Sequence, residues 1–265
     1  MRRVYMLMSL VVACAMVASC GMNGSKNSSD EEHQMPSATL EFWVVCDDNM
    51  KSALTSFLYL EADALVADYY ADVLGQEAPV SLRSLLRDGY IVEGLWGEVY
   101  EAPIGGMFVA AADKESIAQI DEYLELEAVR ARLDEITNGE VKLVWSHKNS
   151  LNDTNDGIYT LYALQGREGV VPATPAMDGS GITDVRAVKS QYGGYEVSIS
   201  MDNPMAVAWA ELTEANIGRH IAIVVNDRVY SAPMVMSRID CGQATISGDF
   251  SPKEAKALAR AIQPR

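Results

Sequence analysis

Hydrophobic and polar positions divide the chain into an apolar leader, a polar stretch and a long patterned body. The leader is the apolar run at residues 4–17, which follows Arg2 and Arg3. It is shorter than the roughly 20 residues that a membrane-spanning helix needs, and its length is typical of a signal-peptide core. Residues 21–37 are rich in Ser, Asn, Gly and acidic residues without apolar periodicity, which predicts a flexible tether.

The first part of the body alternates strand and helix patterns. Residues 40–45 are rich in β-forming residues and predict a strand. Residues 50–74 place apolar side chains at helical spacing, and Gly75 supplies a stop. The pattern then predicts a strand at 107–112, a helical region ending at Asn138-Gly139, and strands at 141–145 and 158–164.

The C-terminal part carries the clearest local signals. Asp202-Asn203-Pro204 offers a capping side chain and a proline for the start of a helix, and Ser251-Pro252-Lys253-Glu254 is a capping box that opens the last one. The strand patterns of this part lie at 196–201, 221–225, 229–232 and 244–247. Strands that pair mostly through hairpins, with helices on one face, make an α+β fold with a mostly antiparallel sheet.

Composition and charge place the chain among globular proteins and narrow its partners. Of its 265 residues, 49% are apolar and 22% are charged, which suits a folded body rather than a disordered tail. Asp and Glu number 37 against 21 Lys and Arg, which gives a net charge of −16. This charge opposes binding to phosphate backbones, so nucleic acid is not an expected partner.

The end of the leader predicts lipid attachment. Val17-Ala18-Ser19-Cys20 resembles the lipobox of bacterial lipoproteins, in which the cysteine becomes lipid-modified and N-terminal. We therefore expect a signal peptide at 1–19, a lipid on Cys20, a tether at 20–37 and an exported protein in the cell envelope, in the periplasm or at the outer-membrane surface. The alternative is an ordinary secretory signal that happens to contain a cysteine.

Two cysteines belong to the body, Cys46 and Cys241. An oxidising compartment permits a disulfide between them. The alternative is two separate small apolar residues, and the sequence leaves both open.

Candidate binding chemistry is confined to a few aromatic residues. Tyr90, Trp96 and Tyr100 lie in a Gly-rich stretch and are candidate contacts for an extended peptide, with a subsidiary core under a long loop as the alternative. The strand at 229–232 offers a second route, edge pairing with a peptide, although Pro233 would blunt that edge.

Residues for catalysis or metal binding are sparse. The three histidines, His33, His147 and His220, form no HExxH motif or close His and Cys set, so no metal or cofactor is expected. No nucleophile elbow or phosphate loop occurs either. We expect a protein that is not an enzyme.

Several segments follow one family in order and spacing. They are 197–201 (VSISM), 211–218 (ELTEANIG), 221–225 (IAIVV), 229–233 (VYSAP) and 246–255 (ISGDFSPKEA), preceded by 39–43 (TLEFW), 129–145 and 181–186 (GITDVR). This pattern resembles the head of the first large periplasmic domain of SecD and SecDF, membrane proteins that assist export through the Sec translocon. The resemblance is strong after Gly181 and looser before it.

The resemblance implies a division of the body and a function. Residues 38–180 would correspond to the upstream part of the SecD periplasmic domain and 181–265 to its head, without the transmembrane helices that follow in the family. The implied role is an accessory binding protein whose partners are unfolded or translocating polypeptide or Sec translocon components. The chain ends at Arg265, so we expect that it cannot use a proton gradient alone. The alternative is an envelope or cell-surface lipoprotein that binds a folded protein or glycan.

Overall fold

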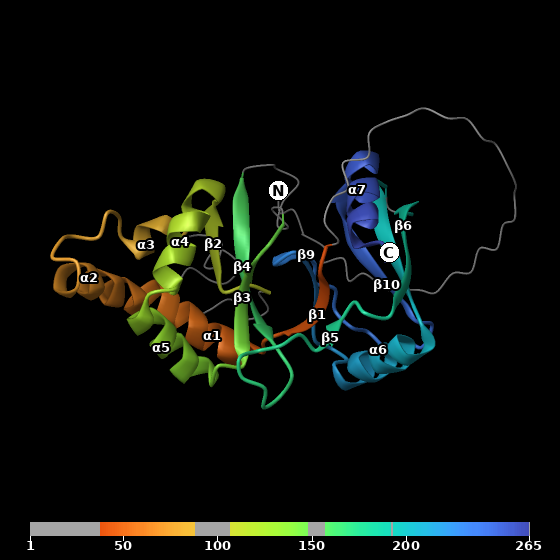
Figure 1. The fold of residues 1–265 in the computed structure, drawn as a ribbon, viewed down its shortest axis with the longest axis horizontal. Coiled ribbons are helices and arrows are strands. Elements are labelled where there is room, and N and C mark those ends of the chain that lie inside the picture. The colour runs from red at the N-terminus through yellow and green to blue at the C-terminus, as the bar shows by residue number, and fades with distance from the viewer. Residues whose placement is uncertain (1–37, 88–106, 148–156, 192, 265) are drawn as a thin grey trace, which may run out of the picture.

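The computed structural model describes residues 38–87, 107–147, 157–191 and 193–264. It is an α+β structure in which a curled sheet stands between a layer of helices and a smaller sheet (Figure 1). The strands are β1 (Leu40–Val45), β2 (Ala110–Asp113), β3 (Val141–Trp145), β4 (Ile158–Gln165), β5 (Met177–Asp178), β6 (Ile182–Lys189), β7 (Tyr195–Met201), β8 (Ile221–Val225), β9 (Arg228–Ser231) and β10 (Gln243–Phe250). The helices are α1 (Asp48–Ser56), the π-helix η1 (Phe57–Glu61), α2 (Ala62–Asp72), α3 (Leu82–Leu85), the 3₁₀ helix η2 (Lys114–Ser116), α4 (Ile117–Leu124), α5 (Glu127–Thr137), α6 (Asn203–Ala215) and α7 (Pro252–Ile262).

The helix expected at 50–74 forms as three consecutive pieces, α1, η1 and α2. Asp47 begins it, because its side chain accepts a hydrogen bond from the Met50 amide at 2.9 Å. The chain leaves the helix at Gly75, whose φ of +65° lies in the left-handed region that favours glycine. The π-helical turn is a departure from the expected continuous α-helix.

The larger sheet curls until its two ends meet. Its path runs β2-β4-β1-β8-β9, with β3 paired to β4 and β5 paired to β1. Ser146, directly after β3, forms a parallel bridge with Val229 of β9, and the His147 amide donates to the Val229 carbonyl at 2.8 Å. The curled sheet encloses its own core, which is lined by Trp43, Val45, Val144, Tyr162, Leu164, Ala222, Val224 and Val229.

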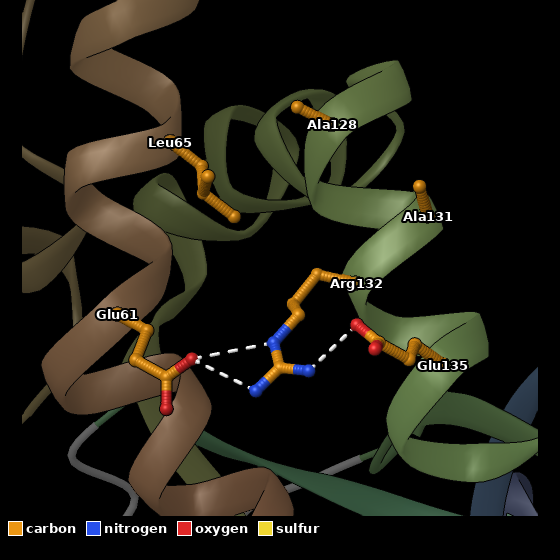
Figure 2. Close-up of a pocket in the computed structure, with 6 residues that line it drawn as sticks. All are labelled: Glu61, Leu65, Ala128, Ala131, Arg132 and Glu135. Atoms are coloured by element: carbon orange, nitrogen blue, oxygen red, sulfur yellow. Dashed lines mark hydrogen bonds and ion pairs between the residues drawn. The ribbon is translucent and has the colours of Figure 1, made fainter.

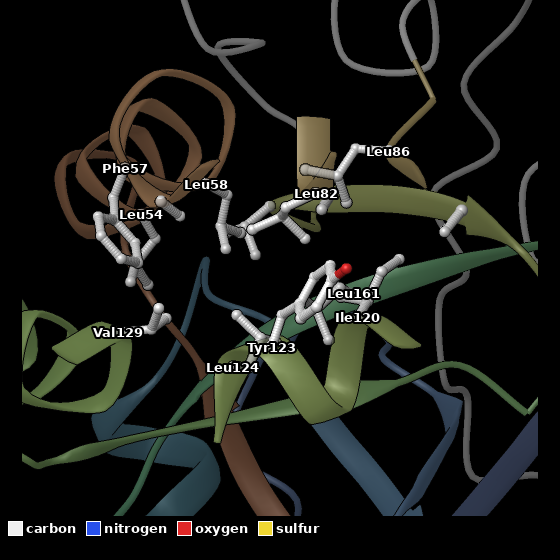
Figure 3. Close-up of a cluster of buried hydrophobic side chains, with 14 of the residues drawn as sticks. Leu54, Phe57, Leu58, Leu82, Leu86, Ile120, Tyr123, Leu124, Val129 and Leu161 are labelled. Carbon is white, nitrogen blue, oxygen red and sulfur yellow. The ribbon is translucent and has the colours of Figure 1, made fainter. Parts of the chain in front are cut away.

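The helices α1 to α5 pack on the outer side of β2 and β4, as Figure 1 shows. We call them the helical layer. Their buried side chains include Leu54, Phe57, Leu58, Leu82, Ile120, Tyr123 and Val129, and Figure 3 shows them gathered in one cluster with Leu161 of β4. The Tyr123 hydroxyl donates to the Val80 carbonyl at 2.8 Å, so this buried phenol keeps a hydrogen bond.

The smaller sheet has the order β10-β7-β6 and is antiparallel throughout. Helices α6 and α7 share one core with this sheet and with the β1–β8 side of the larger sheet. Phe42 of β1 and Trp209 of α6 meet there with ring centroids 5.0 Å apart. The two sheets are therefore joined by a common core.

The expected fold class is confirmed: the structure is α+β, its sheets are mostly antiparallel, and it has fewer helices than strands in the described residues. Two details differ from the sequence interpretation. Residues 182–189 form strand β6, which the pattern did not reveal because polar residues interrupt it. Strands β8 and β9 join the larger sheet rather than β7 and β10, so they cross the boundary expected near residue 181. No helix in the described part of the chain is long and apolar enough to span a membrane.

Candidate functional site

Most of the residues singled out from the sequence lie outside the described part of the chain. These are the candidate peptide contacts Tyr90, Trp96 and Tyr100 and the lipid-attachment candidate Cys20. The proposals that rest on them stay predictions.

The two body cysteines have different surroundings, and the structure keeps both as thiols. Cys46 is buried at the end of β1, whereas Cys241 is exposed in the loop before β10. Burial, reinforced by the neighbouring Asp47 carboxylate, raises the pKa of the Cys46 thiol to about 12. Cys46 therefore behaves as an inert core residue, and the disulfide considered from the sequence is not formed in this structure.

The motifs that carry the family resemblance have structural roles. Asp202 caps α6 by accepting from the Met205 amide at 2.8 Å, and a Cβ added at Gly181 would lie 2.6 Å from the Met205 Cβ. Only glycine fits there without a shift of its neighbours. Ser251 and Glu254 form the reciprocal capping box of α7, with bonds of 3.3 and 2.9 Å. These residues fix the fold, as the sequence indicated, and none of them marks a binding site.

The edge of β9 is not open along its length. Val229 is bridged by Ser146 on the side away from β8, and the Ser231 and Ser247 hydroxyl oxygens lie 3.1 Å apart, which links β9 to β10. His147 stacks on Tyr230 with ring centroids 3.9 Å apart, and burial raises the pKa of the Tyr230 phenol. Peptide pairing along residues 229–232, considered from the sequence, would have to displace these contacts.

The structure reveals a surface hollow between two helices of the helical layer, which we call the α2–α5 hollow. It has a volume of about 440 Å³ and is lined by Glu61, Leu65, Ala128, Ala131, Arg132 and Glu135. Figure 2 shows Leu65 and the two alanines at one end and the three charged side chains at the other. The hollow thus has an apolar end and a charged end.

An ion-pair bridge crosses the charged end. The Arg132 guanidinium donates from Nε and Nη2 to Oε2 of Glu61, both at 3.4 Å, and from Nη1 to Oε2 of Glu135 at 2.7 Å. The hydrogen bond to Glu135, followed by the charge of that carboxylate, holds the pKa of Arg132 above its ordinary value. All three side chains are partly exposed, with 39% of Arg132, 52% of Glu61 and 71% of Glu135 accessible.

Sequence reasoning missed this hollow because its residues come from two helices far apart in the chain. The available signal was the spacing alone: Glu61 and Leu65 are four residues apart, as are Ala128 and Arg132. In the described residues, no group of three or more His, Cys, Asp and Glu side chains is arranged to hold a metal ion.

Comparison with known proteins relates this chain to the protein-export apparatus. Residues 157–264 match the model of the SecDF P1 head subdomain. The protein translocase subunit SecD of Rhodothermus marinus is 29% identical over 232 residues, covering 85% of this chain and 36% of that protein. The protein translocase subunit SecDF of Thermus thermophilus is 38% identical over 89 residues, covering 34% of this chain and 12% of that protein.

The chain spans about a third of the length of the Rhodothermus relative and less of the Thermus one. Among solved structures, one of a SecDF described as a membrane component that enhances protein export is 20% identical to this chain. The alignment covers 85% of this chain and 92% of the SecDF chain, with a TM-score of 0.34. The sequence match supports a SecD-like head in residues 157–264. This matched range contains strands β4 to β10.

Proposed function

We propose that this protein is an exported, lipid-anchored accessory of protein export whose SecD-like head contacts unfolded or translocating polypeptide near the Sec translocon. The observation that carries the proposal is the match of residues 157–264 to the SecDF P1 head subdomain. The related SecD and SecDF proteins are translocase subunits. The matching segment contains β4 to β10, α6 and α7.

The proposed activity is binding rather than catalysis. The residues of the family motifs cap helices and fill the core, as Asp202 and Ser251 do. Burial is the main cause of the raised pKa values of four side chains, Cys46, Tyr70, Tyr123 and Tyr230. These observations support a surface that recognises polypeptide without changing it.

The proposed location is the cell envelope, with the lipid on Cys20 and residues 20–37 as a tether. The lipobox-like Val17-Ala18-Ser19-Cys20 supports this part of the proposal. Residues 28–32, Ser-Ser-Asp-Glu-Glu, resemble an acidic surface-export signal of some outer-membrane lipoproteins. A lipid anchor would hold the body near a membrane without a spanning helix.

The test is a binding titration of the full chain in detergent micelles at physiological salt. The ligand is a secretory polypeptide, supplied once in an unfolded form and once in its folded form, with empty micelles as the control. We expect binding in the micromolar range that prefers the unfolded form, because extended polypeptide exposes the apolar and backbone groups that folding hides. Binding to the folded form alone would favour the alternative, an envelope lipoprotein that recognises folded proteins, and binding to neither would refute polypeptide contact.

A further inference from the structure

We infer that the α2–α5 hollow is a docking site for polypeptide segments in which an apolar side chain neighbours a lysine or arginine. This inference rests on the proposed contact with unfolded polypeptide and adds the surface and the chemistry that would recognise it. The surface lies in the helical layer, outside residues 157–264 that match the head. The argument comes from the two ends of the hollow and from the charge around it.

The apolar end has room for a side chain. Ala128 and Ala131 of α5 are both exposed and end at Cβ, so these two lining residues leave room beside Leu65 of α2. Leu65 itself is only partly buried, so it presents apolar surface to the hollow. An aliphatic side chain that entered here would remove part of this surface from water, which is favourable in proportion to the area covered.

The charged end favours a cation over an anion. It contains two carboxylates and one guanidinium, and the guanidinium already donates to both carboxylates. Every bond from Arg132 ends on an Oε2 atom, so Glu61 and Glu135 each present a second oxygen to an incoming lysine or arginine. An incoming carboxylate would instead have to displace one of these bonds from Arg132 and face the carboxylate it displaced.

The surroundings of the α2–α5 hollow are also negatively charged. Helix α2 contains three aspartates, Asp63, Asp68 and Asp72, and no lysine or arginine. The whole chain has a net charge of −16. A field of this sign raises the local concentration of cationic segments and their rate of association. The hollow therefore combines an apolar pocket with long-range attraction for positive charge.

The test uses three fluorescently labelled peptides of equal length, and follows their anisotropy against the full chain in detergent micelles and against empty micelles. One peptide alternates Leu and Lys, one alternates Leu and Glu, and one alternates Ser and Lys. We expect saturable binding of the Leu and Lys peptide only, because it alone offers both groups. Raising the ionic strength from about 0.05 M to about 0.5 M should weaken this binding, since exposed charges are screened over a shorter distance at high salt.

Substitutions in the hollow separate its two ends. Ala131→Trp fills the apolar end and should weaken binding of the Leu and Lys peptide by about tenfold or more, because the pocket is then occupied. Glu61→Gln combined with Glu135→Gln removes both carboxylates of the charged end and should weaken binding of the Leu and Lys peptide by about fivefold, the effect expected for two exposed ion pairs. The matched controls are Ala208→Trp, and Glu115→Gln combined with Glu211→Gln, at exposed positions away from the hollow; both should bind within about twofold of the native chain.

The outcomes distinguish this inference from the proposed function. Circular dichroism and thermal unfolding establish that each variant is folded, and if the tryptophan variant is not, the glutamine pair still tests the site. Equal peptide binding by the native chain, the glutamine pair and its control would overturn the docking site. If the hollow variants bind unfolded secretory polypeptide as the native chain does, the site is refuted while the proposed function stands. If the native chain binds the peptide at the hollow but no secretory polypeptide, the proposed function fails instead.

Discussion

Cys46 and Cys241 have the same side chain and opposite surroundings. Cys46 directly follows β1 and lies among the core residues of the helical layer, whereas Cys241 is exposed. The sequence places one after an apolar run and the other beside a glycine, which hints at this difference. The pKa of a thiol depends on its environment. Because Cys46 is buried, it stays protonated at pH values well above those at which a thiol ordinarily ionises.

This raised pKa predicts a loss of stability in alkali. The unfolded thiol ionises near its ordinary pKa of 9.0, while the folded thiol keeps its proton up to about 12. Between these values the unfolded state binds fewer protons, so the free energy of unfolding falls as the pH rises. From pH 9.0 upward we expect the native chain to lose up to about 1.4 kcal/mol per pH unit more than Cys46→Ala.

Urea unfolding at a series of pH values measures this slope. Cys241→Ala is the matched control, because it removes the exposed thiol and leaves the buried one in place. Identical slopes for Cys46→Ala and the native chain would show that the Cys46 thiol does not resist ionisation.

At the scale of elements, the π-helical turn η1 keeps one face of a long helix buried. The buried positions Leu54, Leu58, Ala62, Val66 and Tyr70 are each four residues apart. In an uninterrupted α-helix of 3.6 residues per turn, such a spacing rotates steadily away from the core. A wider π turn absorbs part of that rotation, so the face stays directed at the sheet.

Removing one exposed residue from η1 should therefore be tolerated. Deletion of Leu60 would let α1 and α2 join as a regular α-helix with their buried faces still aligned. We expect this deletion to cost less than about 1 kcal/mol of unfolding free energy, within the range of surface changes. Deletion of Ala67, which is exposed within α2, turns Tyr70 out of register and should cost about 3 kcal/mol or more.

Urea unfolding followed by circular dichroism compares the two deletions. The informative quantity is the difference between them, because each removes one exposed residue from the same helix. A cost for the Leu60 deletion as large as that for Ala67 would mean that the π turn itself, rather than the face it aligns, is needed.

At the scale of the whole molecule, the two regions expected from the sequence share one sheet. Strand β1 pairs with β8 over five residue pairs, from Leu40–Val225 to Val44–Ile221. Phe42 of β1 packs on Trp209 of α6. Strands β8 and β9 therefore need β1 on one side, and the core below α6 and α7 includes residues from both regions.

This sharing predicts that residues 181–265 do not fold alone. Without β1 and β4, strand β8 would expose an edge and its apolar residues Ile221, Ile223 and Val225 to water. We expect the isolated fragment to unfold in urea without a cooperative transition, whereas a chain beginning at residue 38 unfolds in one step. Circular dichroism measures both, and a cooperative transition of the fragment with native helix content would contradict the prediction.

Local patterns in the sequence determined the elements. The run of β-forming residues at 40–45, the Asp202 cap and the Ser251 capping box each depend on residues a few positions apart, and the structure confirms all three. The resemblance to a SecD-like head was equally accessible, because residue order and turn chemistry carry it. Strand β6 was missed because Asp184 and Arg186, which form an ion pair, interrupt its apolar pattern.

Tertiary structure alone decided which elements meet. Pairing between β1 and β8 joins residues almost two hundred positions apart, and no local pattern specifies which of several strands becomes a partner. The α2–α5 hollow arises in the same way, because the side chains of Leu65 and Ala131 become neighbours only when α2 and α5 pack on one sheet. Short-range capping and periodicity are encoded residue by residue, whereas a hollow depends on what two distant helices leave unfilled between them.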